Sequence, residues 1–265
     1  IIEKVAPTSS RVLIYGDSGT GKDVVAREIH KNSKYCNGPF IVINAAILEP
    51  EGIESELFGH DNGNGEIVTG LFEKSNNGTL FIDEVGEMPL QTQAKILRVL
   101  TDQTFTRVGD DKLISIDSRI ICSSTKDLNK LIDNGNFRKD LFHRLNVVNI
   151  TIPNLNERLE DLDLIIDYFS KYFSDLNSVK NVDLKPLIKS KYLNYEWPGN
   201  IRELRNLIER YIIIGDKFDD SNIEDNQYKS DSKNVISMPL KNARKVFEKN
   251  YLQSQIKRFN GNISK

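Results

Sequence analysis

The sequence predicts an α/β domain, built on a parallel sheet with helices on both faces, followed by a small all-helical domain. Three observations lead to this fold class. Short apolar runs that do not alternate with polar residues are separated by helical patterns, which is typical of a parallel sheet buried on both faces. A glycine-rich segment joins the first run to the first helical pattern. Beyond Pro153, helical periods continue without strands. The predicted strands cover residues 12–15, 40–43, 80–82, 119–122 and 147–152.

The spacing of apolar residues predicts the helices. Val25 and Ile29 stand four apart just after the glycine-rich segment, and residues 90–100 carry apolar side chains at the spacing of one helix face. After Pro153 we expect three helices, the second over 186–193 and the third over 201–214. The apolar stripe of the first of these is Leu159, Leu162, Ile166, Phe169 and Phe173, and that of the third is Leu204, Leu207, Ile208 and Tyr211.

These changes in pattern predict four parts of the chain. Residues 1–153 form the α/β subdomain and residues 154–215 a small all-helical subdomain, which the resemblance described below makes a lid. Residues 216–238 are polar and acidic, which indicates a linker. Residues 239–265 begin with a further helical pattern over 240–259.

Length and composition restrict the function classes. A chain of 265 residues is long enough for one large or two modest domains. A net charge of −2 argues against binding of nucleic acid through the overall electrostatic field of this chain. Cys36 and Cys122 lack metal-ligand spacing and indicate no disulfide scaffold, so we expect a cytoplasmic protein. No apolar run is long enough for a membrane span, so we expect no membrane partner.

One segment predicts phosphate binding. Gly16, Asp17, Ser18, Gly19, Thr20, Gly21 and Lys22 follow a predicted strand and precede a predicted helix, with the spacing of the phosphate-cradling loop. Its glycines let backbone N–H groups turn inward, the helix N-terminus adds its dipole, and Lys22 adds a full charge. Asp23 stands where the general pattern has a magnesium-binding hydroxyl. The alternative is an ordinary glycine-rich turn with a surface lysine.

Two carboxylates end the third predicted strand. Asp83 and Glu84 would face the phosphate loop, because ligands of open α/β sheets lie at the carboxyl ends of strands. We expect Asp83 to hold Mg²⁺, through water, and Glu84 to polarise the attacking water as general base. The alternative is an acidic turn. Ser123, Ser124 and Thr125, at the end of the fourth strand, could sense the γ-phosphate through their hydroxyls or be an ordinary polar strand end.

Three arginines allow two interpretations each. Arg138 and Arg144 are either surface cations that pair with Asp140 or arginine fingers that reach a neighbouring subunit's nucleotide. Arg202 follows Asn200, which suits a helix N-cap, with Glu203 completing a capping box. A cation in a first helical turn costs roughly 0.3–1 kcal/mol. A bound phosphate could repay that cost, and Glu203 could equally offset it.

Taken together, these segments resemble the AAA+ domain of bacterial enhancer-binding proteins, the activators of sigma-54 RNA polymerase, in the response-regulator branch of NtrC and NtrX type. The resemblance covers nearly the whole chain. It rests on the phosphate loop through Asp23 and on the segments 56–60, 78–84, 137–145 and 197–204, which include Glu-Leu-Phe-Gly-His, Gly-Thr-Leu-Phe-Ile-Asp-Glu and Trp-Pro-Gly-Asn-Ile-Arg-Glu-Leu.

The resemblance implies an ATPase with ATP and Mg²⁺ at subunit interfaces of a ring, typically a hexamer or its dimeric precursor. It makes Arg138 and Arg144 the trans-acting fingers and Arg202 the second sensor, and it aligns Ser124 and Thr125 with the first sensor. Asn44 matches the residue that restrains the catalytic glutamate. The end of the chain resembles the entry to a Fis-like helix-turn-helix that binds DNA.

One departure concerns the loop that grips sigma-54. The family carries Gly-Ala-Phe-Thr-Gly-Ala there, whereas residues 61–70 contain no aromatic side chain, and only Thr69 and Gly70 echo the motif. An aromatic tip that could bury against a partner is therefore missing. Two functions remain open: an ATPase module of a two-component transcription regulator, or a nucleotide-responsive DNA-binding scaffold that acts without remodelling sigma-54.

Overall fold

The structure, a computed structural model, describes residues 1–47, 50–61, 67–180, 182–192 and 195–215. Residues Ile1–Ile212 form one compact unit, and the second unit, Ile213–Lys265, is described only at its start. The predicted linker over 216–238 and the predicted helix over 240–259 lie outside the described residues. The fold below is that of the first unit.

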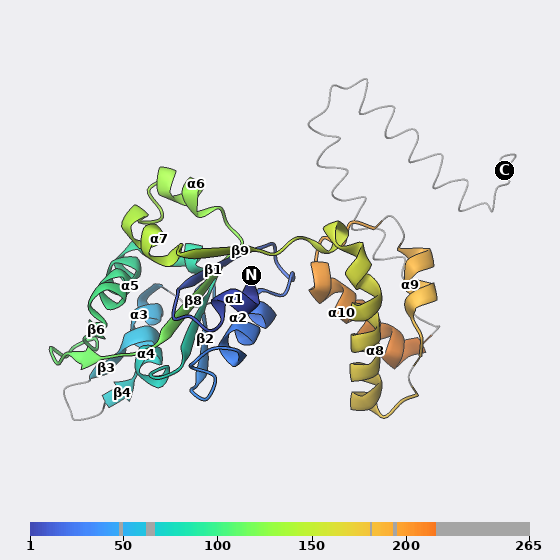
Figure 1. Cartoon of the computed structure of the whole chain (residues 1–265), viewed down its shortest axis with the longest axis horizontal. Coiled ribbons are helices and arrows are strands. Elements are labelled where there is room, and N and C mark those ends of the chain that lie inside the picture. The colour runs from blue at the N-terminus through green and yellow to red at the C-terminus, as the bar shows by residue number, and fades with distance from the viewer. Residues whose placement is uncertain (48–49, 62–66, 181, 193–194, 216–265) are drawn as a thin grey trace, which may run out of the picture. The chain divides into compact units, whose positions relative to one another are not determined.

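A five-stranded parallel sheet lies at the centre of the α/β part (Figure 1). Its strand order is β2-β5-β8-β1-β9, so β1 lies between β8 and β9. All five predicted strands are confirmed, each within two residues of its expected ends. The strands are β1 (Val12–Tyr15), β2 (Phe40–Asn44), β5 (Thr79–Asp83), β8 (Arg119–Ser124) and β9 (Val148–Thr151).

Both faces of the sheet are buried, which explains why the strands do not alternate. Leu13 of β1 packs into a core with α3, α5 and α7, whereas its neighbours Val12 and Ile14 pack on the opposite face with α1 and α2. Phe81 and Leu80 of β5 divide between the two cores in the same way. Because successive strand residues point to opposite faces, both must be apolar when both faces are covered.

The helix predicted over 90–100 is confirmed as α5 (Leu90–Asp102), which ends where Gln103 adopts a φ of 55°. Short hairpins, β3 with β4 and β6 with β7, lie outside the main sheet. The remaining elements of the α/β part are α1 (Ile2–Val5), α2 (Lys22–Lys31), α3 (Pro50–Phe58), β3 (Gly59–Asp61), β4 (Ile67–Thr69), α4 (Leu71–Lys74), a 3-10 turn (Val85–Glu87), β6 (Thr104–Phe105), β7 (Ile114–Ser115), α6 (Leu128–Asp133) and α7 (Lys139–Leu145).

Within the described residues, three α-helices follow β9, as predicted for this part: α8 (Leu162–Asn177), α9 (Lys185–Lys191) and α10 (Asn200–Ile214). All four residues of the predicted apolar stripe of α10 are buried. The apolar stripe of α8 is confirmed from Leu162 onward, but the prediction that Leu159 belongs to it is wrong, since Leu159 is 50% exposed. Leu159 lies in a separate 3-10 turn (Leu159–Asp161) after a first one (Leu155–Glu157), so the α-helical period does not extend back to it.

Candidate functional site

A cleft of about 590 Å³ lies at the carboxyl edge of the sheet. Its walls come from the loop after β1, the ends of β2 and β5, and helices α8 and α10. Parallel strands present ligand sites at this edge. The residues predicted to bind or hydrolyse nucleotide that line this cleft are Ser18, Gly19, Gly21, Lys22, Asp23, Asn44, Asp83, Glu84 and Arg202.

The loop after β1 depends on its glycines. Gly19 and Gly21 have φ values of 79° and 99°, a conformation that costs glycine little and other residues much. A Cβ at Gly19 would also lie 2.3 Å from the carbonyl oxygen of Gly199, so the loop and the start of α10 approach too closely for a side chain. Helix α2 begins at Lys22, and the N–H groups of its first turn have no acceptor within the helix.

Lys22 is buried at the base of the cleft. Its ammonium group donates to the carbonyl oxygens of Gly16 (2.8 Å) and Asp17 (3.2 Å) and lies 3.6 Å from Glu84 Oε1. Only 8% of the Lys22 side chain and 17% of the Glu84 side chain are exposed. Asp23 is exposed and lines the same cleft. The structure therefore brings together the lysine of the loop and the second strand-end carboxylate, as the sequence predicts.

The two strand-end carboxylates have different partners. Asp83 accepts from the Ser123 hydroxyl and, at 3.4 Å, from Asn44 Nδ2. Glu84, in a left-handed conformation with a φ of 54°, accepts through Oε2 from the backbone N–H (3.0 Å) and the hydroxyl (2.8 Å) of Thr125. In this structure the amide of Asn44 contacts Asp83, because the ends of β2 and β5 pair Asn44 with Asp83 in register, and the restraint of the glutamate by Asn44 stays a prediction.

The hydroxyl side chains at the end of the fourth predicted strand have different partners. Ser124 is fully buried, and its hydroxyl donates to the carbonyl oxygen of Lys126 at 2.8 Å. It does not line the cleft, and a γ-phosphate contact by Ser124 stays a prediction. The hydroxyl of Thr125 donates to the Glu84 carboxylate. Ser123, which points to the opposite side of the strand from Ser124, is the residue that reaches Asp83 and the Glu84 N–H (3.2 Å).

The start of α10 contacts the phosphate loop. Arg202 Nη1 donates to Ser18 Oγ at 2.7 Å, and Asn200 Nδ2 donates to the Ser18 carbonyl oxygen at 3.1 Å. The predicted capping by the Asn200 side chain is wrong, since its Oδ1 accepts from the Leu155 N–H (2.8 Å). Glu203 Oε2 does reach back, to the Gly199 N–H at 2.9 Å.

Sequence reasoning missed two residues that hold the phosphate loop from the chain after β9. Arg158 Nη2 donates to the Thr20 carbonyl oxygen, and Asn154 Nδ2 donates to Asp17 Oδ2, both at 2.8 Å. Neither belongs to a recognisable motif. The available signal was position: both follow Pro153, where the α/β part gives way to the helical part.

Arg138 and Arg144 lie at α7 and do not line the cleft. Arg138 pairs with Asp140 through two bonds, Nε to Oδ1 (3.0 Å) and Nη2 to Oδ2 (2.7 Å), which raises the pKa of Arg138 and lowers that of Asp140. Arg144 is exposed in the last turn of α7. Within this chain, therefore, neither arginine completes the cleft.

Within the described residues, no three His, Cys, Asp or Glu side chains gather to hold a metal ion. None of the helices in these described residues combines the length and the apolar character of a membrane span. Cys122 is buried in the core, and burial raises its pKa to about 12, whereas Cys36 is exposed.

Comparisons with known proteins assign a family to both parts of the first unit. A family model described as "Sigma-54 interaction domain" matches residues 1–151, and one described as "AAA+ ATPase lid domain" matches residues 156–230. The nitrogen assimilation regulatory protein NtrX of Azorhizobium caulinodans is 41% identical over 100% of the chain and 61% of its own length. The regulatory protein AtoC of Escherichia coli is 46% identical over 80% of the chain and 47% of its length.

Solved structures agree with the sequence comparisons. NtrX from Brucella abortus, crystallised in complex with ATP, has a TM-score of 0.77 and 42% identity over 99% of this chain and 61% of that one. The same protein has been crystallised with ADP. The chain thus spans about three fifths of the length of these relatives. The predicted fold class, a P-loop sheet with a helical lid, is confirmed by these matches.

Proposed function

The chain belongs to the family of sigma-54 interaction domains of AAA+ type, and on that premise we propose that it binds and hydrolyses ATP in the cleft at the carboxyl edge of its sheet. The observation that carries the proposal is the meeting of Lys22 and Glu84, whose charged groups lie 3.6 Å apart although the two residues are distant in the sequence. A lysine for the outer phosphates and a carboxylate for the attacking water are the two side chains that phosphoryl transfer to water needs.

The residues present fit a nucleoside triphosphate with Mg²⁺. Gly19 and Gly21 leave the loop backbone open to phosphate oxygens, and the first turn of α2 supplies unpaired N–H donors and a positive dipole end. Asp83 and Asp23 both offer carboxylate oxygens to the cleft, and Mg²⁺ bound to phosphates needs only one or two such ligands. When bound, Mg²⁺ would neutralise charge on the β- and γ-phosphates.

Glu84 is the general base of the proposal. Its Oε2 is occupied by two bonds from Thr125, and its Oε1 faces Lys22. In the reaction, water attacks the γ-phosphorus, the bond to the leaving ADP oxygen breaks, and a proton of the water passes to Glu84. Asp83 is the proposed Mg²⁺ ligand next to Glu84, and hydrogen bonds from Ser123 and Asn44 orient its carboxylate. Arg202, bound to Ser18 in the loop, links the lid to the state of the phosphates.

A Glu84→Gln substitution tests the base. The amide keeps the size and the bonds to Thr125 but cannot accept the proton, so we expect phosphate release to fall at least ~100-fold while ATP affinity changes less than ~3-fold. Glu87→Gln, an exposed carboxylate on the turn that follows, is the matched control. Unchanged phosphate release in Glu84→Gln would refute Glu84 as the base.

The cleft is completed, in our proposal, by a neighbouring protomer of a ring oligomer. Arg138 and Arg144 support this, because both are exposed at α7 and neither reaches the cleft of its own chain. Activity per subunit should then rise with protein concentration. Arg144→Ala should lose activity alone, and mixing it with Glu84→Gln should restore a fraction, since each chain supplies what the other lacks. Activity independent of concentration would exclude action in trans.

Within a longer protein, we propose that this module serves a transcription regulator of two-component type in the bacterial cytoplasm, with a sigma factor and DNA as partners. The named relatives support the regulator role, and the two free thiols support a reducing compartment. The DNA-binding part would begin in residues 239–265, outside the described residues.

A second function, a nucleotide-responsive scaffold that does not remodel sigma-54, is favoured by residues 61–70, which lack an aromatic tip. The two functions separate in one experiment. The chain is incubated with sigma-54 and a transition-state nucleotide analogue, and co-migration is measured. Stable capture supports the activator and excludes the scaffold. Absent capture alongside normal ATP hydrolysis supports the scaffold.

A further inference from the structure

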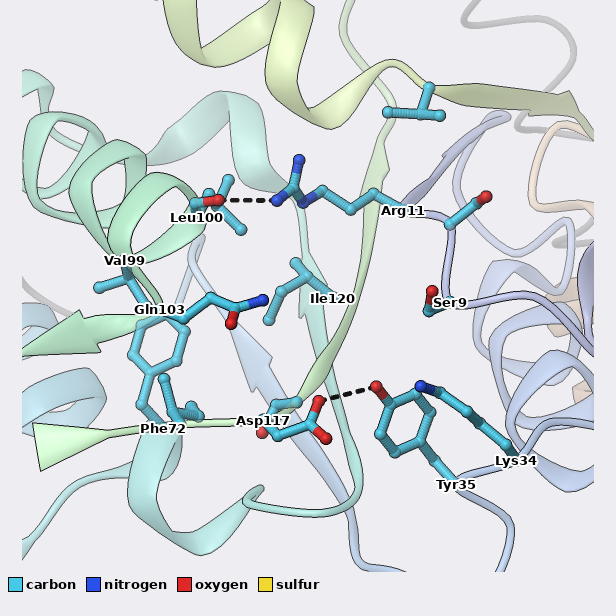
Figure 2. A pocket seen from close by; sticks show the side chains of 14 residues that line it. Ser9, Arg11, Lys34, Tyr35, Phe72, Val99, Leu100, Gln103, Asp117 and Ile120 are labelled. Atoms are coloured by element: carbon cyan, nitrogen blue, oxygen red, sulfur yellow. Dashed lines mark hydrogen bonds between the residues drawn. The ribbon is translucent and has the colours of Figure 1, made fainter.

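A second cavity, of about 390 Å³, lies at the opposite, amino edge of the sheet (Figure 2). It is bounded by the segment that enters β1, the chain after α2, the end of α5 and the start of β8. It shares no lining residue with the cleft described above. Its volume falls at the small end of the range of ligand pockets, about 300–1,000 Å³.

The cavity combines an apolar wall with a cationic one. Leu100 and Ile120, each 5% exposed, contribute to the apolar wall, whereas Phe72 is fully buried and offers a ligand no surface. Arg11 and Lys34 carry positive charge, and Figure 2 shows both side chains among those that line the cavity. The one carboxylate of the lining, Asp117, already accepts a hydrogen bond from the Tyr35 hydroxyl at 2.8 Å. Two cations and one carboxylate give the lining a net charge of +1.

Arg11 holds a partly buried charge that no described carboxylate neutralises. Its guanidinium donates to two backbone carbonyl oxygens, that of Leu100 at 2.7 Å and that of Arg144 at 3.3 Å. Burial lowers the pKa of Arg11, and the nearby charge of Arg144 lowers it further. The exposed Arg144 thus adds a repulsive charge to the cost of burying Arg11. A single negative charge would relieve that repulsion, and the two carbonyl bonds hold Arg11 in place for it.

We propose that this cavity binds a small organic monocarboxylate, with its carboxylate against Arg11 and its apolar body against Leu100 and Ile120. A guanidinium matches a carboxylate geometrically, with two parallel N–H donors. A net charge of only +1, with Asp117 present, disfavours dianions such as phosphate monoesters. The apolar wall favours a ligand with a phenyl or branched aliphatic body over a bare anion. This inference does not depend on ATP hydrolysis.

The test uses the whole chain, labelled at isoleucine methyl groups, and three probes: phenylacetate, 3-phenylpropionate and 4-methylvalerate. Ile116 and Ile120 line the cavity and serve as reporters. We expect saturable shifts of both methyl signals with at least one probe. The neutral amide of that probe should bind at least tenfold more weakly, because it keeps the shape and lacks the charge.

Variants locate the binding. Arg11→Met should weaken binding at least tenfold, and Ser9→Trp, an exposed rim position whose new side chain would fill the mouth, should abolish it without disturbing the core. Lys34→Gln should weaken binding severalfold, whereas Lys31→Gln, an exposed lysine of α2 outside the lining, should not. The proposal is overturned if none of the three carboxylates gives saturable shifts, if the amide binds equally well, or if Ser9→Trp binds like the natural chain.

Discussion

The two edges of the central sheet neutralise their cations in different ways. At the carboxyl edge, Lys22 faces the Glu84 carboxylate across 3.6 Å. At the amino edge, Arg119 is 1% exposed, and its guanidinium donates only to backbone carbonyl oxygens, those of Ala6 (2.7 Å) and Val5 (2.9 Å). Arg11, at the same edge, also donates to carbonyl oxygens.

This difference indicates that the cation at the carboxyl edge serves ligand binding, whereas Arg119 at the amino edge serves the stability of the fold. A cation paired with a carboxylate at an open cleft can exchange that partner for a phosphate, so its charge serves a ligand. A guanidinium buried against the end of α1 donates to the Ala6 carbonyl oxygen and shares the Val5 carbonyl oxygen with the N–H and hydroxyl of Thr8, so its charge serves the fold. Substitutions at the carboxyl edge should therefore mainly change nucleotide chemistry, and those at Arg119 should mainly change the free energy of unfolding.

Lys22→Met should give the largest effect. Loss of a charged hydrogen-bond donor to phosphate costs about 1.5–3 kcal/mol, so ATP affinity should fall roughly 10–100-fold, with hydrolysis falling further. Titration with a fluorescent ATP analogue measures the affinity. The matched control is Lys31→Met, at the exposed end of the same helix, which should bind normally. If Lys22→Met binds ATP as tightly as the natural chain does, the charge of Lys22 does not serve the nucleotide.

Arg119→Met tests the other edge. It leaves the carbonyl oxygen of Ala6 without its donor, whereas that of Val5 keeps the N–H and hydroxyl of Thr8, so we expect a loss of about 1–3 kcal/mol in the free energy of unfolding. Urea denaturation measures this loss, and ATP affinity of the folded fraction should stay within ~3-fold. Arg98→Met, an exposed arginine of α5, should change stability by less than ~0.5 kcal/mol. Equal stability of Arg119→Met and Arg98→Met would contradict a structural role.

The two edges also differ in how far the sequence predicts them. The carboxyl edge is built from contiguous motifs, so the spacing of residues alone places Gly16–Lys22, Asp83 and Glu84 at one site. The amino edge joins Arg11, Lys34 and Asp117, which lie far apart in the sequence and belong to no motif, so only the fold brings them to one cavity. The sequence also does not predict which face of β8 each serine side chain occupies. The fold decides that Ser123, and not Ser124, reaches Asp83.

Ser123→Ala should give a smaller effect than Lys22→Met at the same edge. Its hydroxyl donates to Asp83 and accepts from the Glu84 N–H, so its loss should slow hydrolysis about tenfold through misplaced carboxylates while ATP affinity holds. Ser124→Ala is the paired substitution, since that hydroxyl serves only the Lys126 backbone. It should hydrolyse ATP within ~3-fold of the natural rate. A larger loss of hydrolysis in Ser124→Ala than in Ser123→Ala would contradict the role given to Ser123 and support one for Ser124.

The smallest effect should be a pH dependence at the amino edge. His30 hydrogen-bonds Thr79 Oγ1 at 2.9 Å, and burial, then the charges of Arg119 and Arg27, lower its pKa. An unfolded chain has a histidine pKa near about 6.5, so below that pH the unfolded state takes up the proton first and stability falls. The difference in unfolding free energy between the natural chain and His30→Gln should therefore shrink as pH drops from about 7.5 to about 5.5. In the Arg119→Met background the shrinkage should be weaker, because one of the repelling charges is gone. A pH dependence that does not change with Arg119 would mean that burial alone sets the pKa of His30, and that the charge at this edge is screened from its neighbours.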